Sequence, residues 1–274
     1  KTGEDTETKG LVEFRHVDFA YPDTGAKILH DLNFEIRPGE TFAIIGATGS
    51  GKTTLASLIP RFYEVTGGQV LVDGIDVKSY DLSALREKVT TCLQKSELFS
   101  ATIRENIDVQ AERHSLHPEE DDKKRDPKRE AQIKKAAADA QAESFILNQP
   151  DGYDTKVAER GMSLSGGQRQ RISISRALLR HSEIMIFDDS TSALDLSTEA
   201  KLYEALKSGY GDVTKIIIAQ RIASVKDADR ILVLERGRVA GLGSHEELLA
   251  SNEIYRAICD SQLKNDKNEN RKGA

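Results

Sequence analysis

Short apolar runs rich in valine and isoleucine alternate with helical patterns along most of the chain. Continuous apolar runs of this length, bounded by turn residues, are typical of buried strands. They lie at residues 41–45, 184–187, 216–219 and 231–234, and a helix of about residues 52–59 is expected after the first of them. The alternation predicts an α/β core around a largely parallel sheet.

Three further segments alternate apolar with polar positions and lie near turn signals, at residues 12–14, 34–36 and 70–72. Alternation of this kind favours a smaller antiparallel sheet. Between about residues 98 and 181 the chain has helical patterns without a convincing strand. We therefore expect a helical subdomain that is inserted into the α/β core.

Residues 110–130 form a highly charged stretch, in which 13 of 21 residues carry a charge. Leu116 is its one large apolar residue, and Pro118 and Pro127 are expected to interrupt any helix. Such a composition predicts a solvated loop, with a docking or regulatory surface as the alternative. Both ends of the chain, residues 1–10 and 263–274, are also polar, and we expect a linker and a tail without secondary structure.

Composition narrows the classes of function. The chain has 274 residues, of which 38% are hydrophobic and 31% charged, as in ordinary globular domains. Its net charge of −6 offers no basic surface for phosphate tracking, so we expect no nucleic-acid partner. Two unclustered cysteines, Cys92 and Cys259, favour a reducing compartment over a disulfide framework. No run approaches eighteen apolar residues, and the start lacks the apolar region of a signal peptide.

A glycine-rich segment, Gly-Ala-Thr-Gly-Ser-Gly-Lys-Thr at residues 46–53, matches the phosphate-binding loop pattern between a strand and a helix. Its glycines let backbone N–H groups turn toward phosphates at a helix N-terminus. Lys52 would reach the terminal phosphates, and Thr53 would offer a hydroxyl to Mg²⁺. The residues expected to bind ATP here are Gly46, Thr48, Gly49, Ser50, Gly51, Lys52, Thr53 and Thr54.

The apolar run at residues 184–187 ends in a carboxylate, Asp188, followed by Asp189. In nucleotide-binding proteins with this loop, an acidic residue at the end of a buried strand holds the magnesium shell. Asp188 is therefore the expected partner of Thr53 at the metal.

Residues 164–171, Leu-Ser-Gly-Gly-Gln-Arg-Gln-Arg, resemble the signature of ATP-binding cassette (ABC) proteins. Ser165 and the glycines after it would present a hydroxyl and backbone N–H groups at a helix N-terminus, a second anion site. In the family, two cassettes pair head to tail, and each signature closes over the nucleotide of the other chain. The resemblance thus implies a second cassette as partner. Its ATP would be contacted by Ser165, Gly166, Gly167 and Gln168.

The resemblance extends over about residues 12–262, with the motifs in the family's order. Tyr21 matches the aromatic residue that stacks on adenine, and Gln94 matches the glutamine that senses magnesium and the attacking water. Residues 192–195, Ser-Ala-Leu-Asp, match the loop that crosses to the opposite subunit. The implied metal shell consists of Thr53, Gln94 and Asp188.

The fold that the resemblance implies is a RecA-like P-loop NTPase core within residues 11–262. A small antiparallel β-subdomain and the inserted helical subdomain complete it. Segments at residues 61–63, 98–107 and 155–161 resemble exporter cassettes, with Glu159 at an acidic contact position and Ala158 where glycine is usual. The implied partners are transmembrane domains, reached through the Gln94 region and the Glu159 segment, at the cytoplasmic face of the cell membrane.

Two residues depart from the pattern of active cassettes. Asp189 stands in place of a glutamate that polarises the attacking water; it is one methylene shorter, and misplacement by about 1 Å costs on the order of 100-fold in rate. Gln220 stands in place of a histidine that contacts the γ-phosphate; an amide donates a hydrogen bond but carries no positive charge. Together they predict a site that binds ATP and hydrolyses it slowly.

The family includes heterodimeric exporters with one degenerate and one competent site, and the resemblance implies that this chain is the degenerate half. A self-sufficient homodimer is the first alternative. A soluble cassette ATPase acting on ribosomes or DNA is the second, but such proteins typically carry two cassettes or a long coiled coil, which this sequence lacks. A third is a non-hydrolysing, ATP-gated clamp, which differs only in how much Asp189 can still do.

Overall fold

The computed structural model describes residues 8–23, 25–95, 97–109, 126–157 and 163–272. The chain divides into two compact units. The first contains residues 1–91, 183–189 and 212–274, and the second contains residues 92–182 and 190–211.

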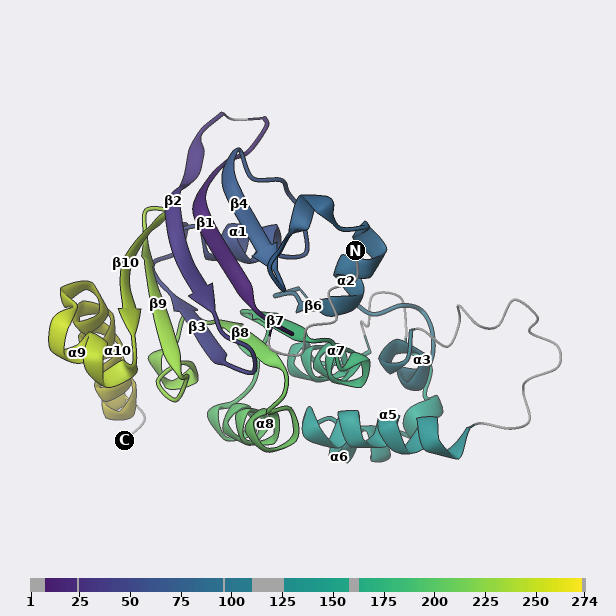
Figure 1. Ribbon diagram of the computed structural model, residues 1–274. Coiled ribbons are helices and arrows are strands. Elements are labelled where there is room, and N and C mark those ends of the chain that lie inside the picture. The colour runs from purple at the N-terminus through teal and green to yellow at the C-terminus, as the bar shows by residue number, and fades with distance from the viewer. Residues whose placement is uncertain (1–7, 24, 96, 110–125, 158–162, 273–274) are drawn as a thin grey trace. The chain divides into compact units, whose positions relative to one another are not determined.

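A six-stranded sheet forms the centre of the first unit, in the order β10-β9-β3-β8-β7-β6 (Figure 1). Its strands are β3 (Thr41–Ile45), β6 (Val89–Cys92), β7 (Ile184–Asp188), β8 (Thr214–Ile218), β9 (Arg230–Glu235) and β10 (Arg238–Gly243). Strand β3 runs parallel to both β8 and β9, β7 runs parallel to β8, and β10 is antiparallel to β9. The four apolar runs became the four central strands, because residues buried on both faces of a sheet must be apolar throughout. The predicted parallel core is confirmed.

A second sheet of the same unit has the order β2-β1-β4-β5 and is antiparallel throughout. Its strands are β1 (Val12–Ala20), β2 (Lys27–Ile36), β4 (Gly67–Val72) and β5 (Ile75–Asp76). Val12, Phe14 and Val17 are buried while residues between them are partly or fully exposed, as the alternating pattern predicted. The expected small antiparallel sheet is therefore also confirmed.

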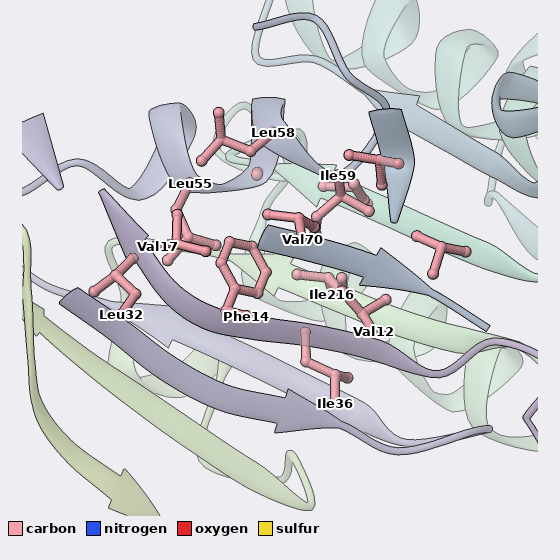
Figure 2. Close-up of a cluster of buried hydrophobic side chains, with 14 of the residues drawn as sticks. Val12, Phe14, Val17, Leu32, Ile36, Leu55, Leu58, Ile59, Val70 and Ile216 are labelled. Atoms are coloured by element: carbon pink, nitrogen blue, oxygen red, sulfur yellow. The ribbon is translucent and has the colours of Figure 1, made fainter. Parts of the chain in front are cut away.

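Helix α1 (Lys52–Leu58) packs its apolar face into a core that both sheets share. Figure 2 shows Leu55 pointing toward Phe14 and Ile59 lying beside Val70 of the antiparallel sheet, and Leu58 belongs to the same buried cluster. A second link is a stack of aromatic rings, in which Phe34 of β2 lies 4.6 Å from Phe14 and 5.8 Å from Phe42 of β3, centroid to centroid. This packing fixes the start of α1, where the glycine-rich segment ends.

The second unit is mainly helical and has an apolar core of its own. Its helices are α3 (Ile103–Ile107), α5 (Pro127–Asp139), α6 (Glu143–Leu147), α7 (Gly166–Arg180) and α8 (Leu196–Gly209), with the short turn η2 (Gly152–Asp154). In the described part of residues 98–181 there is no strand, only an isolated bridge between Thr102 and Lys156. The subdomain boundaries themselves remain a prediction.

Pro127 was expected to interrupt a helix, and that expectation was wrong. It occupies the first turn of α5, where proline is tolerated because the missing N–H has no partner in the helix anyway. Asp126 caps this helix end, and Arg129 binds Asp108 through two contacts of 2.7 Å. The last four residues of the highly charged stretch are therefore helical; residues 110–125 lie outside the described part.

The C-terminal tail was expected to have no secondary structure, and this was also wrong. Helix α10 (Glu253–Lys272) follows α9 (His245–Ser251) and continues through most of residues 263–274. Neither glycine nor proline occurs between residues 253 and 272, so nothing local ends the helix. Asn252 starts it by accepting a 2.8 Å hydrogen bond from the backbone N–H of Tyr255.

The remaining elements of the first unit are short: η1 (Val77–Ser79), α2 (Leu82–Lys88) and η4 (Ile222–Ser224). Among the described residues, no helix combines the length and the apolar character that crossing a bilayer requires.

Candidate nucleotide-binding site

The glycine-rich segment forms a tight loop between β3 and α1, and two of its glycines have no substitute. A Cβ on Gly46 would lie 2.1 Å from the carbonyl oxygen of Leu234, closer than any real contact. Gly51 has a φ of 103° and a Cβ there would meet Leu29 at 2.8 Å. The loop can therefore pack against β9 and β2 only with these glycines.

Lys52 lies at the first position of α1 and folds back over the loop. Its Nζ donates to the carbonyl oxygens of Gly46 and Ala47, at 2.8 and 2.9 Å. Burial lowers the pKa of Lys52, and the charges of Asp189 and Asp188 oppose that effect. An ammonium group held in this way is positioned to donate to phosphate oxygens bound in the same loop.

Thr53 and Asp188 meet at the end of β7. The Thr53 hydroxyl donates to Oδ1 of Asp188 at 3.1 Å, and Asp188 is only 4% exposed. Burial raises the pKa of Asp188, while the Thr53 hydrogen bond opposes the shift. A hydroxyl beside a buried carboxylate fits a hard cation such as Mg²⁺, which keeps several waters and phosphate oxygens as ligands. Among the described residues, no group of three or more histidine, cysteine or acidic side chains could bind a metal by itself.

Asp189 and Gln220, the two departures from the active pattern, are direct partners. Gln220 Nε2 donates to Oδ2 of Asp189 at 3.0 Å. The backbone N–H of Asp189 donates to the carbonyl oxygen of Ile218 at 2.9 Å, which ties the residue after β7 to the end of β8. Asp189 adopts a left-handed backbone, with φ of 47°. Gln220 and Asp189 thus form a hydrogen bond between a neutral amide and a carboxylate. This bond lies next in sequence to the one between Thr53 and Asp188.

Tyr21 is partly buried and linked to α1. Its hydroxyl lies 2.9 Å from Oγ1 of Thr54, and its ring meets those of Phe19 and Tyr63 edge-on, at 4.9 and 5.2 Å. Sequence analysis assigned no part in the site to Tyr63, because its motif, residues 61–63, was informative only about the family.

In the second unit, the signature segment starts helix α7. The Ser165 hydroxyl accepts from the backbone N–H of Gln168 at 3.2 Å, and the Gln168 side chain accepts from the N–H of Ser165 at 2.9 Å, a complete capping box. Gln170 Oε1 accepts from the backbone N–H of Ala193 at 3.0 Å, and a Cβ on Gly167 would lie 3.0 Å from the Ala193 carbonyl oxygen. The structure thus brings the signature together with residues 192–195, a link through Gln170 that sequence analysis missed.

Three expected contacts are not part of these clusters. Gln94 is exposed just after β6 and belongs to the second unit, so its place beside Thr53 and Asp188 stays a prediction. Glu159 lies outside the described residues. Asp195 caps α8, accepting from the hydroxyl of Thr198 at 2.7 Å and from its backbone N–H at 2.9 Å; these hydrogen bonds, the side-chain one most of all, lower the pKa of Asp195.

The first unit combines a largely parallel sheet, a glycine loop leading from a strand into a helix, and a buried aspartate at a strand end near that loop. These features together define the P-loop NTPase class.

Comparison with known proteins narrows the class to a family. The family model described as ABC transporter matches residues 29–192, more than half of the chain, so the chain belongs to the ABC transporter family. It is an ATPase domain of the ABC type, and nucleotide binding follows from that membership.

Similar proteins are named for export, for lipid flipping or as an ABC exporter. YgaD of Bacillus subtilis (strain 168), provisionally described as a multidrug export ATP-binding/permease protein, is 42% identical over 91% of this chain and 41% of its own length. The ATP-dependent lipid A-core flippase of Syntrophus aciditrophicus (strain SB) is 43% identical over 93% and 40%. A bacterial Atm1-family ABC exporter solved with ATP bound has a TM-score of 0.83 and 38% identity, over 92% of this chain and 42% of that one. The chain spans about two fifths of these relatives.

Proposed function

We propose that this chain is the nucleotide-binding domain of an ABC exporter, lying at the cytoplasmic face of a membrane. In this account it binds Mg-ATP, pairs head to tail with a second cassette, and passes closure of the pair to transmembrane domains through the Gln94 region and the Glu159 segment. A relative named for multidrug export at 42% identity and a solved ABC exporter at 38% identity support the assignment.

The proposed ATP site uses the loop between β3 and α1. Lys52 exchanges its contacts with Gly46 and Ala47 for phosphate oxygens, and the ring of Tyr21 stacks on adenine. Thr53 and Asp188 would hold Mg²⁺, with Gln94 as the proposed third ligand, and the ion would supply charge neutralisation at the phosphates. The geometry of the Thr53–Asp188 pair supports this assignment, because both ligand oxygens already lie 3.1 Å apart.

The observation that carries the finer proposal is the contact between Asp189 and Gln220. In active cassettes a longer carboxylate orients the attacking water and a histidine contacts the γ-phosphate. Here the 3.0 Å hydrogen bond directs one amide donor of Gln220 at the shortened carboxylate instead. The site therefore binds ATP well and hydrolyses it slowly, and Asp189 is its weakened catalytic position.

The second half of the proposal concerns the signature. Ser165 and Gln168 form an intact capping box that uses their own backbone N–H groups, and the N–H groups of Gly166 and Gly167 in the first turn of α7 are the ones that would bind the γ-phosphate of a partner's ATP. A chain with a slow site and an intact signature fits the degenerate half of a heterodimer, in which the non-identical partner supplies the competent site.

Complementation between two chains that are each slow alone tests this arrangement. The first is the triple variant Asp189→Glu/Gln220→His/Ser165→Arg, which has a restored catalytic position but a blocked signature. The second is the native chain, with a slow site and an intact signature. Each alone is expected to turn over ATP slowly, whereas the mixture combines a restored site with an intact signature and is expected to be about 100-fold faster.

The control is the same mixture with Ser165→Arg also introduced into the otherwise native chain, which is expected to stay silent. If the triple variant is already active alone, signatures are not shared between chains. If the mixture stays silent although Asp189→Glu/Gln220→His is active by itself, the native signature does not serve a partner. Either result would refute the head-to-tail proposal.

A further inference from the structure

A single side chain of the C-terminal helix holds the backbone on both sides of Arg221. Gln262 Nε2 donates to the carbonyl oxygen of Gln220 at 2.7 Å, and Gln262 Oε1 accepts from the backbone N–H of Ile222 at 2.8 Å. Only one orientation of the amide satisfies both bonds, because its nitrogen faces a carbonyl and its oxygen faces an N–H. The side chain is partly buried, so solvent competes weakly for these bonds.

Buried side chains hold helix α10 in place, so Gln262 can in turn hold the segment that it contacts. Tyr255, Cys259 and Gln262 follow one another at spacings of four and three residues, which places them on one face of the helix. Tyr255 is fully buried, its hydroxyl lies 2.7 Å from Nδ1 of His245, and Cys259 is 7% exposed. This face of α10 thus carries two buried side chains, Tyr255 and Cys259. Three residues further on it carries Gln262, which contacts the segment that contains Gln220.

The consequence reaches the candidate site through Gln220. Its carbonyl oxygen is fixed by Gln262, and its side-chain amide donates to Asp189 at 3.0 Å. The backbone position of a residue limits where its side chain can reach. By holding the backbone at position 220, Gln262 therefore limits the orientations that the side chain there can adopt.

We infer that Gln262 is a positioning residue, whose two hydrogen bonds hold the backbone of position 220 in the geometry needed at the γ-phosphate. The inference rests on the proposed function in one respect, namely that the side chain at position 220 contacts the nucleotide. Gln262 itself touches neither phosphate nor metal in this account.

The test compares Gln262→Ala with Asn252→Ala. Asn252 is a matched control, because it too makes two amide hydrogen bonds from the α10 region, to Ala240 and Tyr255, and has no contact with position 220. Kinetics are measured in the Asp189→Glu/Gln220→His background, and amide hydrogen exchange of residues 220–224 in the native background.

For Gln262→Ala we expect kcat to fall about tenfold, with KM for ATP changed less than twofold, since position 220 is misplaced while the loop that binds phosphates is untouched. Exchange at Ile222 should accelerate. Asn252→Ala should change neither kcat per folded molecule nor exchange at Ile222, even if both variants lower the melting temperature equally.

An unchanged kcat in Gln262→Ala, or an equal loss of kcat in Asn252→Ala, would overturn the inference. If the restored background is itself inactive, the proposed slow-site function fails, and exchange alone decides. Faster exchange at Ile222 in Gln262→Ala only would then still support positioning, and unchanged exchange would overturn it.

Discussion

Asp188 and Asp189 are adjacent in sequence, yet their surroundings give them different properties. Asp188 is buried at the end of β7 and accepts from Thr53, whereas Asp189 has a left-handed backbone and pairs with Gln220. Aspartate and asparagine tolerate that backbone better than longer residues do. The shorter side chain at position 189 thus suits the local backbone, at a cost in reach toward a bound nucleotide.

The buried charge of Asp188 leads to a prediction about stability. Because burial raises the pKa of Asp188, the folded protein binds this proton more tightly than the unfolded chain does. The ionised carboxylate therefore destabilises the nucleotide-free protein at neutral pH, and the penalty vanishes as the pH falls through the raised pKa toward the ordinary value of 3.8. We expect Asp188→Asn, which can still accept from Thr53, to melt above the native chain at pH 7 and level with it near pH 4.

Thermal unfolding without nucleotide at both pH values is the measurement. Asp189→Asn is the matched control, because it removes a neighbouring carboxylate that is only partly buried. A native chain that melts above Asp188→Asn at pH 7 would mean that the contacts of Thr53 and Lys52 outweigh the burial penalty.

At the scale of elements, two helices begin with the same cap in different surroundings. Helix α7 begins with the Ser165–Gln168 capping box in the signature, and α9 begins with the equivalent Ser244–Glu247 pair. Both caps satisfy backbone N–H groups that the helix leaves without partners. Only the cap of α7 has a proposed role at a nucleotide. Comparing substitutions in the two caps therefore distinguishes an effect on stability from an effect on ATP turnover.

Ser165→Ala and Ser244→Ala should each lower the free energy of unfolding by about 1 kcal/mol, the typical cost of losing a serine cap. In the Asp189→Glu/Gln220→His background, only Ser165→Ala should also reduce ATP turnover, by roughly tenfold, because one hydroxyl donor to the phosphate is lost. Chemical denaturation and steady-state turnover measure the two effects. Equal loss of turnover in both variants would assign Ser165 a purely structural role.

The elements also explain how far the sequence could predict the structure. Strand β3 was predicted to the residue, because Thr41 and the four apolar positions after it lie between a turn and the glycine loop. Strand β6, Val-Thr-Thr-Cys, was missed because its short sequence has no continuous apolar run, and pairing in the sheet decides its structure. The helical end of α10 was missed because polar composition was taken as evidence against a helix.

Contacts between side chains were harder to predict from the sequence than helices and strands were. The motif at residues 46–53 predicted the loop, and its expected neighbour Asp188 does contact Thr53. The hydrogen bond between Gln220 and Asp189 joins residues 31 positions apart, and no pattern in a single sequence indicates it. The contact of Gln262 with Gln220, 42 positions apart, had no local signal either.

At the scale of the whole molecule, the two features proposed to bind phosphate lie in different units. The glycine loop belongs to the first unit and the signature to the second. The chain also corresponds to only about two fifths of its relatives, whose names describe permeases, flippases and exporters. Two cassettes arranged head to tail would use both features at each ATP, and hydrolysis should then depend on chain concentration.

ATP turnover of the purified chain across a protein concentration series tests the central claim most directly. The comparison is with Asp189→Glu/Gln220→His, and Lys52→Ala in each background controls for contaminating ATPase. We predict a nearly silent native chain and a double variant about 100-fold faster, with a rate per molecule that rises steeply with concentration. A native chain that hydrolyses ATP briskly and loses this activity with Lys52→Ala would contradict the account, and Asp189 would then be a working catalytic residue of an ordinary homodimer.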